Sequence, residues 1–240
     1  MKTLYSCGCS FMSSDLYDLG TKSFLDQYCE TRGFKHVNLA RSGATNFLIR
    51  LQIEEAIQRN ADYIIISATG SDRIDFATKE AVPVLLKLEN VEYQGYNSIS
   101  EKLIRPNDVC VVSDSINNWT TKEAREIAHS NDKRNIDPGI ITAMTHYVAH
   151  LHNFSLEQNK DYYIISDGLR KLIQLQKKFI FMGGPMFYLD WSWIGMKHLW
   201  TDPQPWDLPN GLDHVTINHT PQVAHDKFLQ TLHNMTPDWN

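Results

Sequence analysis

The sequence predicts a single α/β domain of three layers, in which helices cover both faces of a mostly parallel sheet of about five strands. Short apolar runs alternate with longer amphipathic stretches in the first third of the chain, a pattern typical of βαβ units. Residues 63–66 are apolar without alternation, as expected of a strand buried on both faces. A chain of 240 residues fits one such domain, so we expect residues 1–240 to form a single unit.

The apolar runs also give the expected order of elements. Strands are predicted at residues 4–7, 36–40, 63–66, 109–112 and 178–182, and helices at residues 21–33, 46–59, 138–153, 159–178 and 220–234. Gly33 closes the first helix, and Asn46 is the expected N-cap of the second. We expect residues 116–136 to form a polar insertion and residues 184–210 an aromatic loop.

Charge and cysteine content limit the classes of partner. The formal net charge is 23 − 28 = −5 and no basic run occurs, so nucleic acid is not an expected partner. No signal peptide or apolar run of about 20 residues indicates export or membrane insertion. The four cysteines lack the spacing of a disulfide framework, which predicts reduced thiols in a soluble cytoplasmic protein.

A candidate nucleophile follows the first predicted strand. Gly8 lets the chain leave this strand sharply, so Ser10 is expected at the carboxyl edge of the sheet, where parallel sheets bind ligands. A serine becomes a useful nucleophile only when a base takes its proton. His219, just before the last helix, is the candidate base, and His214 beside Asp213 competes with it. Taken alone, a serine here is more often a turn or helix-cap residue.

The second and third strand ends supply candidate oxyanion ligands. Gly43 lets a backbone N–H group approach a developing oxyanion, and Asn46 belongs to the same segment. After the third strand, the hydroxyl of Thr69 or Ser71 is placed to donate a further hydrogen bond. Each of these residues is also typical of a plain strand-to-helix turn.

Arg73 follows the same strand end and has two readings. Its guanidinium either holds an anionic group or pairs with Asp72 or Asp75. The pairing is the commoner role, because a surface arginine usually finds a carboxylate or water.

Together these segments resemble the SGNH (GDSL-like) hydrolase superfamily, and more closely its divergent members from tailed phages. Residues 5–11, with Gly-Cys-Ser-Phe, are similar to the block that carries the nucleophile. Residues 42–46 resemble the block whose glycine donates to the oxyanion hole. Residues 219–225, a histidine followed six positions later by a second, resemble the last block.

The resemblance implies ester hydrolysis through an acyl-enzyme, without a cofactor. Ser10 is then the nucleophile, His219 the base, and the N–H groups of Ser10 and Gly43 donors to the oxyanion. The substrate is commonly an O-acetyl group of a carbohydrate or another acyl ester. The aromatic loop at 184–210 suits such a substrate, and suits equally a lid or the interface of a homo-oligomer. If a phage encodes the chain, the expected location is the host cytoplasm.

Two positions depart from the family pattern. The third block normally contains Gly-x-Asn-Asp, but residues 68–73 lack the asparagine, so Thr69 or Ser71 has to replace its amide. The family aspartate three residues before the histidine is Thr216 here, which leaves Asp213 as the candidate orienting acid. A Ser–His dyad is therefore one alternative. Another is a catalytically degraded, SGNH-like binding protein that acts on a host component.

Two other site classes are weaker. His146 and His150 lie four apart on one predicted helix, a spacing that can bind zinc, but His152 falls on another face and no glutamate follows His146, so no metal is expected. A flavodoxin-like sheet, the order expected here, also suits nucleotides. However, the first strand ends without the Gly-x-Gly-x-x-Gly run that admits a pyrophosphate.

Overall fold

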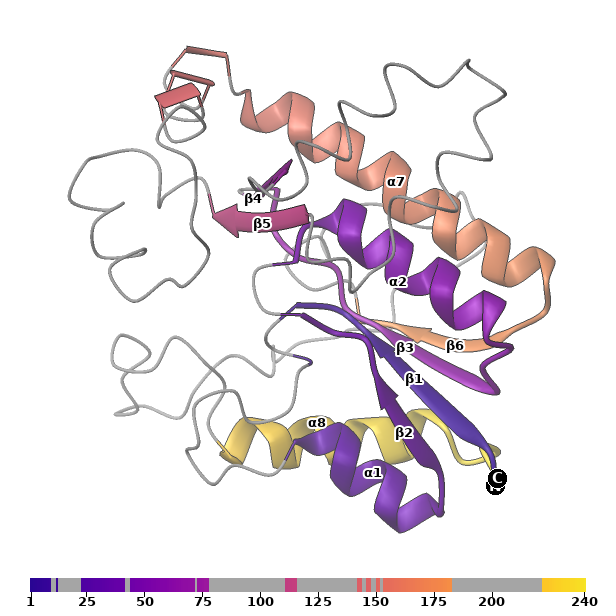
Figure 1. Cartoon of the computed structure of the whole chain (residues 1–240). Coiled ribbons are helices and arrows are strands. Elements are labelled where there is room, and N and C mark those ends of the chain that lie inside the picture. The colour runs from indigo at the N-terminus through magenta and orange to yellow at the C-terminus, as the bar shows by residue number, and fades with distance from the viewer. Residues whose placement is uncertain are drawn as a thin grey trace.

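The structure, a computed structural model, describes residues 1–9, 12, 23–41, 44–71, 73–77, 111–115, 142–143, 146–147, 150–151, 153–182 and 222–240. In this part of the chain, four parallel strands form one sheet in the order β2-β1-β3-β6 (Figure 1). The strands are β1 (Thr3–Cys7), β2 (Lys35–Asn38), β3 (Tyr63–Ile66) and β6 (Lys178–Phe181). The predicted α/β class is confirmed, with four strands rather than about five in the described sheet.

Helices cover both faces of this sheet (Figure 1). On one face lie α1 (Phe24–Arg32) and α8 (Gln222–Met235), and on the other lie α2 (Asn46–Gln58) and α7 (Phe154–Gln174). Each pair of helices shares its own hydrophobic cluster with the sheet. The predicted three-layer arrangement is therefore present in the described residues.

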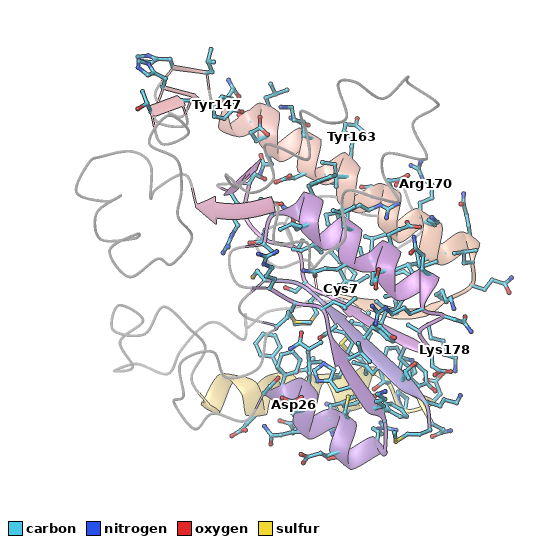
Figure 2. All side chains as sticks on the ribbon, in the orientation of Figure 1. Cys7, Asp26, Tyr147, Tyr163, Arg170 and Lys178 are labelled. Carbon is cyan, nitrogen blue, oxygen red and sulfur yellow. The ribbon has the colours of Figure 1, made fainter. Side chains whose placement is uncertain are left out.

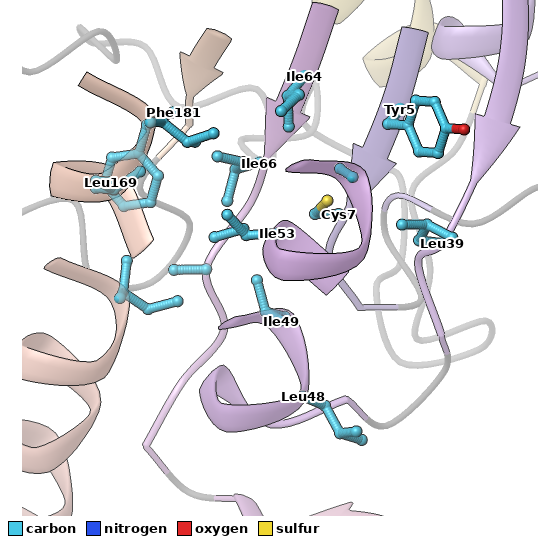
Figure 3. Close-up of a cluster of buried hydrophobic side chains, with 14 of the residues drawn as sticks. Tyr5, Cys7, Leu39, Leu48, Ile49, Ile53, Ile64, Ile66, Leu169 and Phe181 are labelled. Carbon is cyan, nitrogen blue, oxygen red and sulfur yellow. The ribbon is translucent and has the colours of Figure 1, made fainter. Parts of the chain in front are cut away.

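The central strands are apolar because both of their faces are buried. All four residues of β3 are buried, and β1 alternates its side chains between the two clusters. Leu4 points into the cluster under α1 and α8, whereas Tyr5 and Cys7 point into the cluster under α2 and α7 (Figure 3). Only a run without polar alternation fills both clusters, which is why residues 63–66 could be recognised from the sequence.

Side-chain caps fix where the first two helices begin and end. Ser23 caps α1 at its start, and Gly33 ends it in the left-handed region at φ 69°, which glycine adopts without strain. For α2 the predicted cap is wrong: the Thr45 side chain, not that of Asn46, accepts from the amide of Leu48 at 3.1 Å. Asn46 is the first helical residue instead, and its side chain is fully buried.

Other boundaries shift by a few residues from their predicted places. The strand predicted at residues 109–112 lies at β5 (Val111–Ser115), which pairs antiparallel with β4 (Arg73–Ala77) outside the main sheet. The described strand continues past the predicted end into the polar residues 113–115, which hydrophobicity alone does not indicate. The long helix α7 begins at Phe154, capped by Asn153, rather than at residue 159. The polar insertion and the aromatic loop lie outside the described residues, as does most of the helix predicted at 138–153.

An aromatic group closes the amino edge, the end of the sheet at which the parallel strands begin. Trp239 stacks on Tyr63 at a centroid distance of 4.6 Å, and Phe34 packs against the same ring at 4.8 Å. The guanidinium of Arg32 donates to the backbone carbonyls of Thr236 and Trp239, both at 2.9 Å. These contacts hold the residues after α8 against α1 and the start of β3.

Replacing Trp239 with alanine is expected to lower the free energy of unfolding by about 3–5 kcal/mol, because it removes a buried aromatic ring. The change is measured by urea denaturation. Tyr163→Ala is the control: Tyr163 is 66% exposed on α7, so its loss should cost about 0.5 kcal/mol or less. Equal losses in the two variants would contradict the assigned packing.

The cysteine thiols give a second prediction. Burial raises the pKa of Cys7 far above its usual range, and burial with the nearby Asp26 carboxylate raises the pKa of Cys29 to about 12. In a Cys9→Ser, Cys110→Ser variant, these two thiols should stay unreactive toward DTNB even as pH passes the ordinary thiol value of about 8.5. Both should react after unfolding in urea. Rapid reaction of either thiol in the native protein would show that this packing is wrong.

Candidate functional site

The loops after the first three strands meet at the carboxyl edge, the end of the sheet at which the parallel strands finish. Beyond the regular ladder, Ser67 donates its amide to the Cys7 carbonyl at 2.9 Å, and Arg41 donates to the Gly8 carbonyl at 3.1 Å. The chain goes from β1 to β2 on one side and then returns past β1 to β3 on the other. This reversal is the switch point at which open parallel sheets bind ligands.

Gln52 holds the loop after β1 from the side of α2. Its side-chain amide is fully buried; Oε1 accepts from the Gly8 amide at 2.6 Å and Nε2 donates to the Gly8 carbonyl at 3.3 Å. A carboxamide is the side chain that can offer one acceptor and one donor to the same backbone unit. The two contacts fix both the position and the direction of the chain as it leaves β1.

Asn46 holds the loop after β3 in the same manner. Its Oδ1 accepts from the Thr69 amide at 2.8 Å, and its Nδ2 donates to the Thr69 carbonyl at 2.8 Å and to Oδ2 of Asp161 on α7 at 2.9 Å. Because both amide hydrogens are engaged, Asn46 is a positioning residue here rather than a donor to substrate. We call the contacts of Asn46 and Gln52 the amide clamps.

Gly8 is the point of closest approach in this edge. A Cβ added there would lie 2.5 Å from Cγ of Met12 and 3.4 Å from the Ser67 carbonyl oxygen. The Met12 amide donates to the Cys9 carbonyl at 3.0 Å, which brings Met12 back to the end of β1. Glycine is therefore required by packing, and its position agrees with the predicted sharp exit from the strand.

Four of the predicted site residues lie in described segments, namely Asn46, Thr69, Ser71 and Arg73. Thr69 and Ser71 are buried, and among the described residues neither hydroxyl is committed to a hydrogen bond. The other four, Ser10, Gly43, Asp213 and His219, fall outside the described residues, as does His214.

Helix α8 begins at this same edge. It runs alongside α1 in the same direction: Phe228 stacks on Phe24 at 4.9 Å near the start of α1, and Thr236 bonds the Tyr28 hydroxyl at 2.6 Å. Figure 1 shows both helices starting on the side where the strands end. In sequence, His219 precedes the first residue of α8, Gln222, by three positions.

The structure also contains a partly buried polar network that the sequence interpretation missed. Ser6 Oγ lies 2.9 Å from Nε2 of His36, and Nδ1 of that ring lies 2.6 Å from Oδ1 of Asp26 on α1, which Figure 2 labels. Ser6 Oγ also donates to Oδ1 of Asn38 at 3.0 Å, and Nδ2 of Asn38 reaches the Met12 carbonyl at 3.4 Å.

The Ser6, His36 and Asp26 side chains have the connectivity of a catalytic triad, but not its accessibility. Ser6 has no exposed surface, so no ester carbonyl can approach Oγ. Its hydroxyl hydrogen points to Asn38, because Oδ1 of Asn38 is fixed as an acceptor by the Ala40 amide at 2.9 Å. The network holds β1, β2 and α1 together.

A sequence signal for this network existed. Ser6 pairs with Asn38 in the parallel register of β1 and β2, and His36 lies two residues earlier on the same face of β2. Polar side chains at alternate positions of two neighbouring buried strands have to satisfy one another. Reading the two strands together would have indicated the cluster.

Metal-ligating side chains do not gather in the described residues. The rings of His146 and His150 lie 5.7 Å apart, and no group of three or more His, Cys, Asp or Glu side chains is assembled in that part of the chain. His152 lies outside it. Among the helices described, none is long and apolar enough to cross a membrane.

Comparison with known proteins adds no assignment. No protein-family model matches the sequence, and no curated protein matches it. Any function has to be argued from the residues themselves.

The amide clamp at Asn46 gives a third prediction. In Asn46→Asp, a carboxylate replaces the amide donor that faces the Thr69 carbonyl and the Asp161 carboxylate. A buried carboxylate that faces a carbonyl and a second carboxylate should lower the free energy of unfolding by about 3–5 kcal/mol at neutral pH, as measured by urea denaturation. Asn159→Asp, at an exposed position of α7, should cost about 0.5 kcal/mol or less.

The sign of its pH dependence follows from the same contacts. Burial and the neighbouring carboxylate raise the folded-state pKa of the introduced carboxyl above its unfolded value of about 3.9. The loss is therefore complete above the folded pKa and shrinks as pH falls through it, because the protonated group is neutral and can donate one hydrogen bond. A loss that grows toward acid pH, measured relative to the parent protein, would contradict the clamp.

Proposed function

We propose that the chain is a serine hydrolase that cleaves an ester through an acyl-enzyme, as the SGNH hydrolases that it resembles do. Ser10 is the proposed nucleophile, His219 the base and Asp213 the acid that orients the base. The proposed substrate is an O-acetyl or other acyl ester of a carbohydrate or small molecule.

One observation carries this proposal: β1 ends and α8 begins at the same edge of the sheet. Ser10 follows the first element by three residues and His219 precedes the second by three, although more than 200 residues separate them in sequence. Because β1 ends and α8 begins at the same edge, this arrangement supports a reaction that needs both Ser10 and His219. The loop after β3, with the hydroxyls of Thr69 and Ser71, opens on this edge as well.

The proposed chemistry assigns each proton. Ser10 Oγ attacks the ester carbonyl carbon while His219 takes the hydroxyl proton. The N–H groups of Ser10 and Gly43, with the hydroxyl of Thr69 or Ser71, stabilise the oxyanion. His219 then returns the proton to the departing alcohol, and water attacks the acyl-enzyme in a second round of the same steps.

A second candidate is an SGNH-like binding protein without catalysis. It is favoured by the engagement of Asn46, whose amide is bound to Thr69 and Asp161 and therefore does not replace the asparagine that the third family block lacks. An oxyanion hole that relies on hydroxyls in place of that amide is weaker.

A fluorophosphonate probe separates the two candidates. If Ser10 is the nucleophile, the wild-type protein is labelled, Ser10→Ala is not, and hydrolysis of p-nitrophenyl acetate falls by at least about a thousandfold in the variant. Ser6→Ala is the matched control, because Ser6 has a histidine partner but no access, and its labelling should persist.

The other outcomes are equally informative. Labelling that is lost in Ser6→Ala and kept in Ser10→Ala would move the nucleophile to the partly buried network and end the Ser10 assignment. A wild-type protein that is neither labelled nor able to cleave the ester above background would leave the binding-protein candidate.

A further inference from the structure

Arg73 stands beside the loop that the Asn46 clamp fixes. It is the first residue of β4, paired with Ser115 of β5, and follows Thr69 by four positions. Four residues span at most about 14 Å, so Arg73 is tied to the carboxyl edge by a short length of chain. The residues between them include Ser71, which is buried.

Arg73 is half-buried, and one donor of its guanidinium, Nε, is buried without a hydrogen-bond partner among the described residues. Within the described part of the chain, no carboxylate forms an ion pair with this guanidinium. The Nη atoms of Arg32 bind two carbonyls, and the guanidiniums of Arg50 and Arg59 pair with the carboxylates of α2 and α7. The pairing predicted from the sequence involves Asp72 and Asp75, and both of these side chains lie outside the described ones.

A buried, charged donor without a partner weakens a fold, and native proteins retain such groups where a ligand completes them. The Nε–H and Nη–H groups of arginine form a planar fork that matches the two oxygens of a carboxylate or phosphate. The hydroxyls of Thr69 and Ser71, uncommitted among the described residues, add neutral donors on the same stretch of chain. Together these donors are suited to bind a carboxylate or phosphate group.

We propose that Arg73 binds a carboxylate or phosphate group carried by the substrate, so that the enzyme prefers anionic esters. The preference for anionic esters rests on the proposed function, whereas the binding of a carboxylate or phosphate group by Arg73 does not. In a protein of net charge −5, the positive charge of Arg73 offsets the general repulsion of an anionic substrate.

Binding is tested without catalysis, in the Ser10→Ala protein. The ¹⁵N–¹H resonance of the Arg73 Nε group, assigned by its loss in Arg73→Lys, is followed by NMR during titration with inorganic phosphate and, separately, sodium acetate at matched ionic strength. We expect a saturable shift with at least one anion, and the stronger binder distinguishes phosphate from carboxylate. Arg170→Lys, on the outer helix α7 (Figure 2), should leave the shift intact. An Arg73 signal indifferent to both anions would overturn the proposal.

Selectivity is tested in the active protein by comparing mono-p-nitrophenyl succinate with neutral p-nitrophenyl acetate. In Arg73→Gln the anionic-to-neutral ratio of kcat/KM should fall about 10–100-fold, and less in Arg73→Lys, which keeps the charge but loses the fork. Arg170→Gln should not change the ratio, and an unchanged ratio in Arg73→Gln would refute the preference. If the wild-type protein cleaves neither ester, the proposed function fails. The NMR titration then still decides whether Arg73 binds phosphate or a carboxylate.

A purely structural role for Arg73 predicts a different result. Replacement by methionine removes the unpaired donor and keeps much of the side-chain volume, so in anion-free buffer the Tm should stay level or rise. A Tm lowered as far as that of Asn46→Asp would show that Arg73 supports the fold, and would overturn its assignment to a ligand.

Discussion

Two buried amide side chains on α2 hold the backbone of Gly8 and Thr69, and the loops after β1 and β3 take their positions from these contacts. Each amide meets one backbone unit through both an acceptor and a donor, so neither loop can shift without leaving a polar group unpaired in the interior. Such a loss costs more inside the protein than at its surface. The positions of these two loops at the carboxyl edge are thus set by α2, a helix that carries none of the proposed reacting groups.

The opposite face of the sheet holds the same loop by different chemistry. There the ring of His36 bonds Asp26 and Ser6, and the side-chain amide of Asn38 donates to the carbonyl of Met12. Met12 in turn packs where a side chain on Gly8 would lie. Gly8 at the end of β1 is therefore contacted from both layers of helices, directly by Gln52 of α2 and through Met12 on the side of α1.

The layers could be predicted because their signals are local. An unbroken apolar run at residues 63–66 and a glycine at position 33 each have one good structural explanation. The role of Asn46 could not be predicted, because capping and clamping use the same side chain and only the distant Thr69 backbone decides between them.

The two edges of the sheet have different freedom to change. At the amino edge, Gly33 and Phe34 alone connect α1 to β2, and Trp239 closes the aromatic group over Tyr63. The long connections run from β5 to α7 and from β6 to α8. The helices α7 and α8 that follow them are packed against the sheet. Surface connections of this kind tolerate exchange better than the packed layers that they join. The amino edge is therefore the part of the sheet that is least open to change, because its connection from α1 to β2 is only two residues long.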